Sequence, residues 1–190
     1  MDRTDVLDAA AQLFRQKGYA ATSMQDIAEV VKLQKASLYH HVESKQDILF
    51  SLLEQALDLL ISDMRPVVDS ELSPQEKLHL AMQVYVGRLT IDADLAAVLL
   101  LEHRNLDRKL RARHNIRRDR YEALWRKIIA EGVETGVYRP LDVSIATFAI
   151  LGVQNWMITW YRDSGRLSAV ELADKFSELF LSGLLVKEKA

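Results

Sequence analysis

The chain contains no cysteine, and only seven glycines and three prolines occur among its 190 residues. Without cysteine it can form neither disulfides nor thiolate metal sites, and a reducing cytoplasm is the simplest compartment for it. Glycine and proline are the residues that most often let a chain turn sharply, so their scarcity favours long helices. Apolar residues make up 49% of the chain, which suits one large domain or a small domain joined to a bigger one.

Long hydrophobic runs and an excess of charge of one sign are also missing. The longest unbroken apolar run, Leu95 to Leu101, is far below the roughly 18 residues that a membrane span requires. The start, "MDRTDVLDAA", carries acids where a secretory signal needs a basic segment and an apolar run. The formal charge is −2, and residues 1–50 hold six Lys/Arg against seven Asp/Glu. We therefore expect a soluble cytoplasmic protein in which any DNA binding comes from local geometry rather than from bulk charge.

Apolar residues recur at three- and four-residue steps along nearly the whole chain, which indicates amphipathic helices. The first helix is expected from about Asp2 to Lys17, with Gly18 as its C-cap. Ser23, followed three residues later by Asp26, resembles a capping box that opens a short second helix. The other helices are expected over residues 34–41, 44–66, 74–90, 92–104, 107–136, 142–162 and 168–186. No useful stretch alternates with a period of two, so the predicted fold is all-α, with about nine helices and no sheet.

Two short helices joined by a tight turn and packed on a longer first helix form the helix-turn-helix arrangement, which sets its second helix in the DNA major groove. The stretch "GYAATSMQDIAEVVKLQKASLYHHVESKQDIL", Gly18 to Leu49, resembles the TetR family of bacterial transcriptional regulators in its glycine, Thr/Ser cap, Ile-Ala, Leu-Tyr and Ser-Lys positions. The helix order and the chain length also fit that family. The resemblance implies a helix-turn-helix DNA-binding domain over residues 1–46 and an effector-binding and dimerisation domain over residues 47–190.

The residues expected at the DNA surface lie mostly at helix starts. A helix N-terminus offers free N–H groups to a phosphate, so one of Thr22 and Ser23 can cap the helix while the other touches DNA. Lys35 lies at the start of the second short helix, the end that contacts base edges, and is suited to pair with guanine. The resemblance implies that Tyr39 offers its hydroxyl to a phosphate. The predicted DNA-binding set is Thr22, Ser23, Gln34, Lys35, Ser37, Tyr39, His40 and Lys45.

The adjacent histidines His40 and His41 do not suit a metal site. Neighbouring helix residues point about 100° apart because a turn takes 3.6 residues, so this pair cannot readily converge on one ion without other ligands. We expect no metal ligands and no catalytic residues; His40 is placed near a phosphate, while His41 either approaches DNA or covers an apolar edge. Lys32 stands where the family often has glycine, so either the turn has a different shape or Lys32 is strained in a left-handed conformation.

The last two predicted helices carry apolar stripes that suit a dimer. Two subunits could join these helices as a four-helix bundle, and two-fold symmetry would then require a near-palindromic operator. The predicted dimerisation residues are Phe148, Gly152, Trp160, Leu172, Phe176, Leu179 and Phe180, with Trp156 beside them.

The segment from Glu102 to Lys127 is strongly basic, with ten Lys/Arg against four Asp/Glu. Most of its charges fit a solvated helix face, but three polar side chains interrupt an apolar stripe, and polar groups that point inward need partners. They form either a buried hydrogen-bond network or part of an effector site. The predicted effector-binding residues are these three, His114, Arg117 and Tyr121, together with Asn155, Trp156 and Thr159 on the tryptophan-bearing helix.

The stretch "LGVQNWMITWYRDSGRLSAVELADKF", with the "RDRYEALW" before it, resembles a branch of the family that responds to acyl-CoA thioesters and controls lipid breakdown. The resemblance implies a homodimeric repressor without a cofactor that a small-molecule effector, for which it suggests an acyl-CoA thioester, releases from a DNA operator. An apolar chain needs a tunnel between helices, and CoA phosphates need a basic rim, which the arginine-rich helix would provide.

Two other interpretations remain. The first is a related regulator of an efflux or other operon that responds to an uncharged lipophilic compound. The second is a helical enzyme or interaction protein without a DNA role, although no nucleophile–base or paired-acid arrangement has a persuasive spacing.

Overall fold

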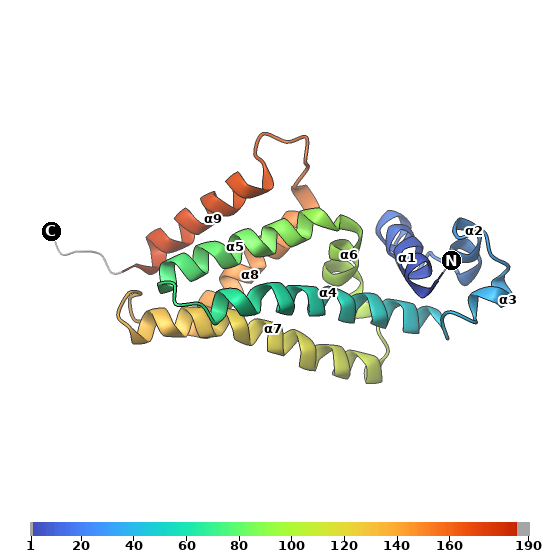
Figure 1. Cartoon of the computed structure of the whole chain (residues 1–190), viewed down its shortest axis with the longest axis horizontal. Coiled ribbons are helices and arrows are strands. Elements are labelled where there is room, and N and C mark those ends of the chain that lie inside the picture. The colour runs from blue at the N-terminus through green and yellow to red at the C-terminus, as the bar shows by residue number, and fades with distance from the viewer. Residues whose placement is uncertain (1, 186–190) are drawn as a thin grey trace. The chain divides into compact units, whose positions relative to one another are not determined.

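The computed structural model describes residues 2–185, which form nine α-helices joined by short connections (Figure 1). Within that range no strand is present, and one isolated bridge joins Tyr138 to Leu185. The helices are α1 (Arg3–Lys17), α2 (Met24–Val30), α3 (Lys35–Leu38), α4 (Lys45–Val68), α5 (Pro74–Ile91), α6 (Ala93–Ala97), α7 (Arg108–Glu134), α8 (Val143–Trp160) and α9 (Ala169–Leu184). The predicted all-α fold of nine helices is therefore confirmed.

Most helix starts carry the capping signals that the sequence shows. The Ser23 side chain accepts from the Asp26 N–H at 3.1 Å, and the Asp26 carboxylate accepts from the Ser23 N–H at 2.7 Å, so the predicted capping box is present. The Ser44 hydroxyl likewise accepts from the Asp47 N–H at 3.0 Å at the start of α4. These bonds satisfy N–H groups that a helix leaves without an internal partner, which is why the starts could be predicted closely.

The structure differs from the predicted boundaries in three places. The helix predicted over 34–41 contains only the four residues of α3 and continues as turns. The one predicted over 92–104 is α6 followed by a π-helical turn, Val98–Glu102, and a 3-10 turn, His103–Asn105. Helix α4 passes Pro66 instead of stopping there, because a proline in the last turn removes only one hydrogen bond.

The chain packs into two compact units, each with its own core. Among the described residues, the first unit contains residues 2–58 and 92–118, and the second contains residues 59–91 and 119–185. This division follows packing; the functional division at residue 46 stays a prediction. In the first unit α1 packs against α2, α6 and the π-helical turn. Its core includes Val6, Ala10, Phe14, Ile27, Leu38, Ile48 and Leu53.

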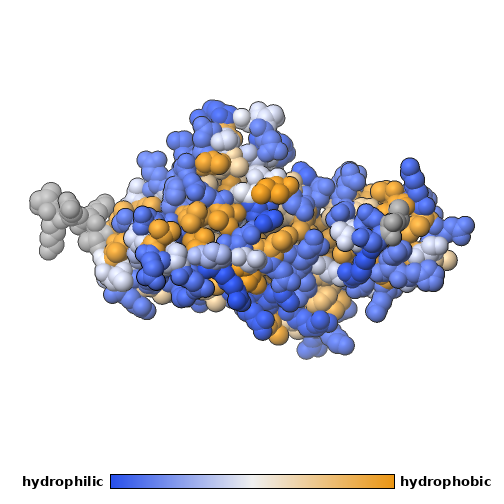
Figure 2. All heavy atoms as spheres, in the orientation of Figure 1, coloured by the Kyte–Doolittle hydropathy of each residue, from blue (hydrophilic) through white to orange (hydrophobic). Residues whose placement is uncertain are grey.

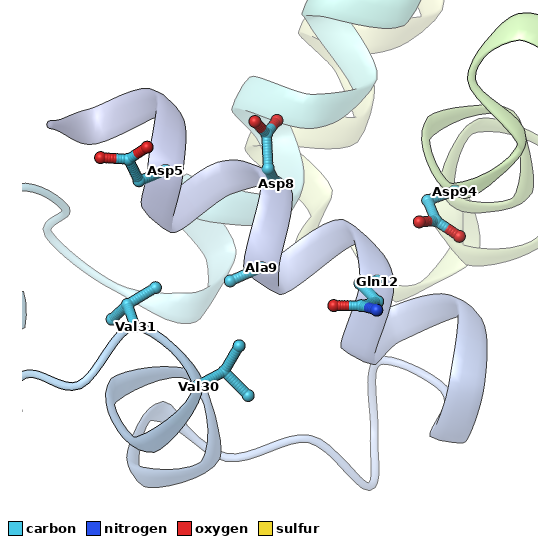
Figure 3. A pocket seen from close by; sticks show the side chains of 7 residues that line it. All are labelled: Asp5, Asp8, Ala9, Gln12, Val30, Val31 and Asp94. Carbon is cyan, nitrogen blue, oxygen red and sulfur yellow. The ribbon is translucent and has the colours of Figure 1, made fainter. Parts of the chain in front are cut away.

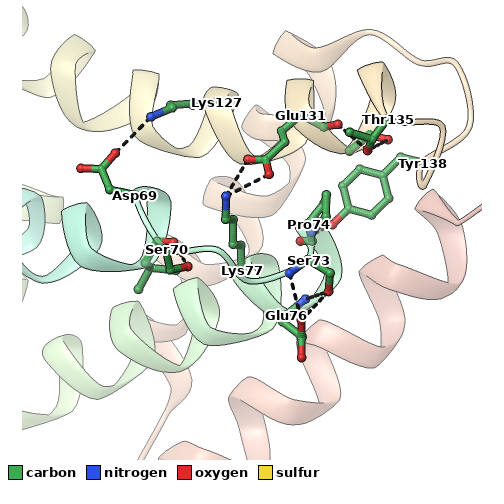
Figure 4. Close-up of polar contacts among 12 residues, drawn as sticks. Asp69, Ser70, Ser73, Pro74, Glu76, Lys77, Lys127, Glu131, Thr135 and Tyr138 are labelled. Carbon is green, nitrogen blue, oxygen red and sulfur yellow. Dashed lines mark hydrogen bonds and ion pairs between the residues drawn. The ribbon is translucent and has the colours of Figure 1, made fainter.

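In the second unit α5 packs along α9 and also contacts α8. The Tyr138 ring lies directly on Gly132, where a Cβ atom would stand only 2.1 Å from the ring. Its hydroxyl donates to the Pro74 carbonyl at 2.7 Å, and nearby Lys77 donates to both Glu131 oxygens at 2.9 Å (Figure 4). Buried polar side chains at this end of the unit are thus fully paired, as is usual in protein interiors.

Candidate DNA-binding surface and effector site

Thr22 and Ser23, the two residues predicted at the start of α2, differ in how exposed their side chains are. Ser23 is exposed and caps the helix, whereas Thr22 is only 1% exposed. The Thr22 hydroxyl donates to the Gly18 carbonyl at 2.9 Å, so it ties α2 to the end of α1. In this structure the Thr22 side chain therefore supports the surface, and Ser23 lies on it.

The turn between α2 and α3 contains a left-handed residue. Lys32 has φ +54°, and it is the non-glycine residue with positive φ among those that the structure describes. The Leu33 N–H reaches back to the Ala28 carbonyl at 2.8 Å, and Ala28 is fully buried. Left-handed backbone is costly for a residue that has a Cβ atom. Of the two alternatives for Lys32, the structure shows the strained left-handed conformation.

The short helix α3 and the turn after it present an exposed polar strip. Gln34, Lys35 and His40 are exposed, Ser37 is half-buried, and Tyr39 is 48% exposed. No side chain caps the start of α3, so the N–H groups of its first two residues have no side-chain partner. The strip thus gathers one cation, several hydrogen-bonding groups and free helix N–H groups within a few residues. Such a set can bind phosphates and read base edges.

The residues beneath this strip anchor it. Leu38 and Val42 are buried, as their helical spacing predicts. His41 is half-buried, and it lies in the chain between the exposed His40 and the buried Val42.

Lys45, at the start of α4, is engaged inside the first unit. Its Nζ atom donates to the carbonyl oxygens of Tyr19 at 2.9 Å and Thr22 at 2.7 Å, and it lies 4.3 Å from the centre of the Tyr19 ring. The neighbouring Gln46 amide donates to the Tyr19 hydroxyl and to the Asn105 carbonyl, both at 2.8 Å. Lys45 and Gln46 therefore hold the loop before α2 against the start of α4, a role that sequence reasoning missed.

Two of the predicted effector residues, His114 and Arg117, belong to the first unit. Arg117 pairs with Glu54 at 2.8 Å and with Asp58. His114 is 2% exposed, and its Nδ1 lies 3.8 Å from Glu54 Oε1, too far for a hydrogen bond. Burial, together with His103 and Arg118, lowers the pKa of His114 to about 4, so the ring is neutral at pH 7. Burial raises the pKa of Glu54, although Arg117 opposes this.

The other four predicted effector residues belong to the second unit and separate into two pairs. Tyr121 is buried and lies in an aromatic cluster, and Asn155 accepts from the Tyr85 hydroxyl beside that cluster. Trp156 is 67% exposed, and Thr159 is also exposed and donates to the Trp156 carbonyl at 2.7 Å. The structure thus brings Tyr121 and Asn155 toward one interior cluster and leaves Trp156 and Thr159 at the surface.

Helices α8 and α9 expose much of their apolar surface. The Trp156 side chain lies on a stripe with Phe148, 52% exposed, and Trp160, 46% exposed. By length and composition alone α8 could cross a membrane, and only 22% of that span is buried within the chain. Apolar residues also reach the surface over α9 (Figure 2). Of the predicted dimerisation residues, Gly152 and Leu179 are exposed and Phe176 and Phe180 half-buried, while Leu172 is buried.

A shallow hollow of about 640 Å³ lies elsewhere on the first unit, between α1, α6 and the end of α2 (Figure 3). It contains none of the predicted DNA-binding or effector residues. Burial and neighbouring acids, Asp92 first among them, raise the pKa of Asp8 on its rim. Its lining is Asp5, Asp8, Ala9, Gln12, Val30, Val31 and Asp94. Across residues 2–185, no group of three or more His, Asp or Glu side chains is placed to hold a metal ion.

Comparison with known proteins relates both parts of the chain to one family of regulators. Residues 6–52 match the family of bacterial regulatory proteins of the tetR type, and residues 71–184 match the C-terminal domain of proteins like the tetracyclin repressor. The chain is 30% identical to the transcriptional repressor KstR2 of Mycobacterium tuberculosis, over 96% of this chain and 92% of that protein. It is 28% identical to the fatty acid metabolism regulator protein of Bacillus subtilis, over 94% and 93%.

Solved structures agree with these matches. The regulator PfmR of Thermus thermophilus superposes with a TM-score of 0.87 at 36% identity, over 93% of this chain and 97% of that one. AibR, solved in complex with isovaleryl coenzyme A and operator DNA, superposes with a TM-score of 0.87 at 29% identity, over 93% and 96%.

Proposed function

Because the chain belongs to the TetR family of bacterial transcriptional regulators, we propose that it is a homodimeric repressor that a small-molecule effector releases from a near-palindromic operator. It is a DNA-binding regulator and not an enzyme. Its place of action is the cytoplasm, where chromosomal operators lie. The exposed polar strip on α3, held on a buried helix-turn-helix scaffold, is the observation that carries the proposal.

We assign roles within the predicted DNA-binding set from the position of each residue on the strip. Gln34, Lys35 and Ser37 lie at or near the start of α3, which favours base edges and flanking phosphates. Tyr39 and His40 follow it and suit the phosphate backbone. The remaining three divide in the same way: Ser23 is exposed at the start of α2, whereas Thr22 and Lys45 support the surface from inside.

A second copy of the chain is the partner that suits the exposed faces of α8 and α9. Apolar patches of this kind on soluble proteins mark interaction surfaces, and their aromatic residues are typical interface anchors. We assign Trp156 to this surface together with the predicted residues Phe148, Gly152, Trp160 and Leu179, because its indole is largely exposed. Two-fold symmetry then places the two α3 helices at the two half-sites of the operator.

An acyl-CoA thioester is the effector class that we propose. Support comes from two similar proteins, one a regulator of fatty acid metabolism and the other solved with isovaleryl coenzyme A and operator DNA. It also comes from the basic stretch before and at the start of α7, where Arg104, Arg108 and Lys109 are exposed and can face phosphates. An effector switches the protein only if it binds the DNA-competent and incompetent shapes with different affinities.

DNA binding is tested by gel shift of genomic and random fragments at moderate salt. We expect one genomic fragment to shift selectively with the wild-type protein and Tyr39→Ala to weaken this shift at least several-fold. The absence of any selective shift, with no difference between wild type and Tyr39→Ala, would reject the repressor function.

The effector class is tested separately by thermal shift with acyl-CoAs, free acids and unrelated lipophiles. Stabilisation by uncharged lipophiles but not by acyl-CoAs would replace the acyl-CoA proposal with the alternative of an uncharged lipophilic effector.

A further inference from the structure

Three aromatic rings form an enclosed cluster in the second unit. Tyr85 comes from α5, and Tyr121 and Trp125 come from successive turns of α7; their exposures are 1%, 5% and 0%. The ring centres lie 6.2 Å apart for Tyr85 and Tyr121, 6.1 Å for Tyr85 and Trp125, and 6.5 Å for Tyr121 and Trp125. These separations are those of rings in direct contact, so the polar atoms that the rings carry lie in one interior region.

Two of these polar atoms lack a hydrogen-bond partner among the residues that the structure describes. They are the hydroxyl oxygen of Tyr121 and the indole nitrogen of Trp125, and both are buried. The Trp125 side chain lies close enough to the Tyr121 oxygen to oppose the rise that burial causes in the pKa of Tyr121. On α8, both amide atoms of the fully buried Gln154 are also unpaired, but the next residue, Asn155, is the one that binds Tyr85.

Such atoms are exceptional in a protein interior, where polar groups are normally paired. The same unit pairs its other buried tyrosines: Tyr138 donates to the Pro74 carbonyl at 2.7 Å, and Tyr85 donates to Asn155. The Tyr121 and Trp125 donors lie in one ring cluster whose third ring carries a paired hydroxyl, which indicates a ligand site there rather than loose packing of the whole unit.

The charges around the cluster decide what kind of ligand fits. The buried and half-buried cations of the second unit are already paired: Lys77 with Glu131 at 2.9 Å, Arg88 with Asp63, and Arg126 with Glu122. Burial is the main cause that raises the pKa of Tyr121, and the negative charge of the Asp63 carboxylate raises it further. A negatively charged group would thus be desolvated beside neutral donors and near an acid.

We propose that Tyr121 and Trp125 bind the carbonyl oxygen of a neutral acyl group, such as a thioester, and that this site discriminates against the corresponding free carboxylate. A carbonyl oxygen has two lone pairs and can accept one bond from the phenol and one from the indole. The inference rests on the proposed acyl-CoA effector and adds the two donors that hold the acyl carbonyl and the selection against the free acid.

The unpaired donors also predict how free and bound protein respond to mutation. Removing the Tyr121 hydroxyl deletes a group that has no partner, so Tyr121→Phe leaves the free protein at least as stable as wild type. The same change removes a bond to the ligand. Tyr138→Phe is the matched control, because it deletes a paired hydroxyl of the same unit: it destabilises the free protein and leaves ligand binding unchanged.

The experiment uses the full chain and isothermal titration calorimetry. The probes are saturated acyl-CoA thioesters of short, medium and long chains, the free acids, their methyl esters and coenzyme A alone. Wild type is expected to bind a thioester and the methyl ester of matching chain length more tightly than the free acid. Tyr121→Phe and Trp125→Phe are each expected to weaken thioester and methyl ester binding roughly fivefold to tenfold. Thermal unfolding of the ligand-free variants gives the second readout.

The outcomes separate this inference from the proposed function. If thioesters bind but both variants bind them as tightly as wild type, or if the free acid binds as tightly as the esters, the inference is wrong while an acyl-CoA effector stands. If methyl esters bind with the expected dependence on Tyr121 and CoA thioesters do not, the carbonyl site stands and the acyl-CoA effector fails. Binding of neither ester by wild type would overturn both.

Discussion

Lys45 bonds the backbone of the loop that leads into α2, since its Nζ atom lies 2.9 Å from the Tyr19 carbonyl oxygen and 4.3 Å from the centre of the Tyr19 ring. A second carbonyl, that of Thr22, lies at 2.7 Å. One ammonium group thus donates to two carbonyls and rests on an aromatic face, which is a favourable environment for a cation. The positive charge at the start of α4 therefore orders the helix-turn-helix from within.

Lys45→Met is expected to destabilise the protein by about 1–3 kcal/mol, because it keeps the aliphatic stem and leaves both carbonyls without their donor. Urea unfolding followed by circular dichroism measures this change. Lys35→Met is the matched control: Lys35 is exposed, so its loss should leave stability unchanged while weakening operator binding and lowering the salt slope by about one. The opposite pattern, with Lys35→Met destabilising and Lys45→Met silent, would contradict these assignments.

Lys32 gives a prediction about backbone strain. Its φ of +54° suits glycine better than a residue with a Cβ atom, so Lys32→Gly is expected to raise stability by up to about 1 kcal/mol. The greater freedom of glycine in the unfolded chain offsets part of this gain, and the melting temperature should not fall. Lys32→Ala keeps the Cβ atom and removes the charge, so it should give no gain. A clear loss of stability in Lys32→Gly alone would show that the turn is not left-handed in solution.

The helix-turn-helix could be predicted from sequence because its signals are local. The partners of the Ser23–Asp26 box are three positions apart, and the apolar spacing that buries Leu38 and Val42 repeats within two turns. The partners of Lys45 could not be foreseen, since the Tyr19 carbonyl lies 26 residues away in a loop. A lysine at the start of a helix has the same sequence signature whether it faces a phosphate or an internal carbonyl.

In the second unit, the aromatic cluster could likewise be predicted only in part from the sequence. Tyr121 could be singled out because it interrupts an apolar stripe, but Trp125 is consistent with ordinary core. Only the fold shows that the Trp125 indole N–H has no acceptor among residues 2–185, because that fact depends on neighbours contributed by distant segments of the chain. The exposure of Trp156 could not be predicted from the sequence either, because helical periodicity predicts an apolar stripe but not what covers it.

The exposed apolar stripe on α8 predicts which substitution prevents dimerisation. Trp156→Lys places a charge on the face that we assign to the second copy, so the protein is expected to become monomeric while circular dichroism shows an unchanged helix content. Ile116→Lys is the control, because Ile116 is 58% exposed on α7, outside this face, and should remain dimeric. Sedimentation velocity distinguishes the two. A dimer that survives Trp156→Lys and fails with Ile116→Lys would place the interface elsewhere.

The buried His114 predicts a dependence of stability on pH. Burial is the main cause that lowers its pKa to about 4 from an ordinary value of 6.5, and the nearby His103 and Arg118 act in the same direction. Because the pKa in the folded state lies below that in the unfolded state, the contribution of His114 is fully present above about pH 6.5. It is lost as the pH falls toward 4, by up to roughly 3 kcal/mol.

Glu54 faces His114 and acts in the opposite sense, since burial raises its pKa and its contribution is therefore lost as the pH rises. His114→Leu isolates the histidine: the free energy of unfolding in urea, measured between pH 4 and 7, should fall less steeply toward acid than in wild type. The control is His79→Leu, because the His79 side chain is 41% exposed and sits near Asp174 at the surface. Equal acid sensitivity of wild type and His114→Leu would mean that the His114 ring is solvated in solution and that the contact between α4 and α7 at Glu54 is looser than the 3.8 Å separation implies.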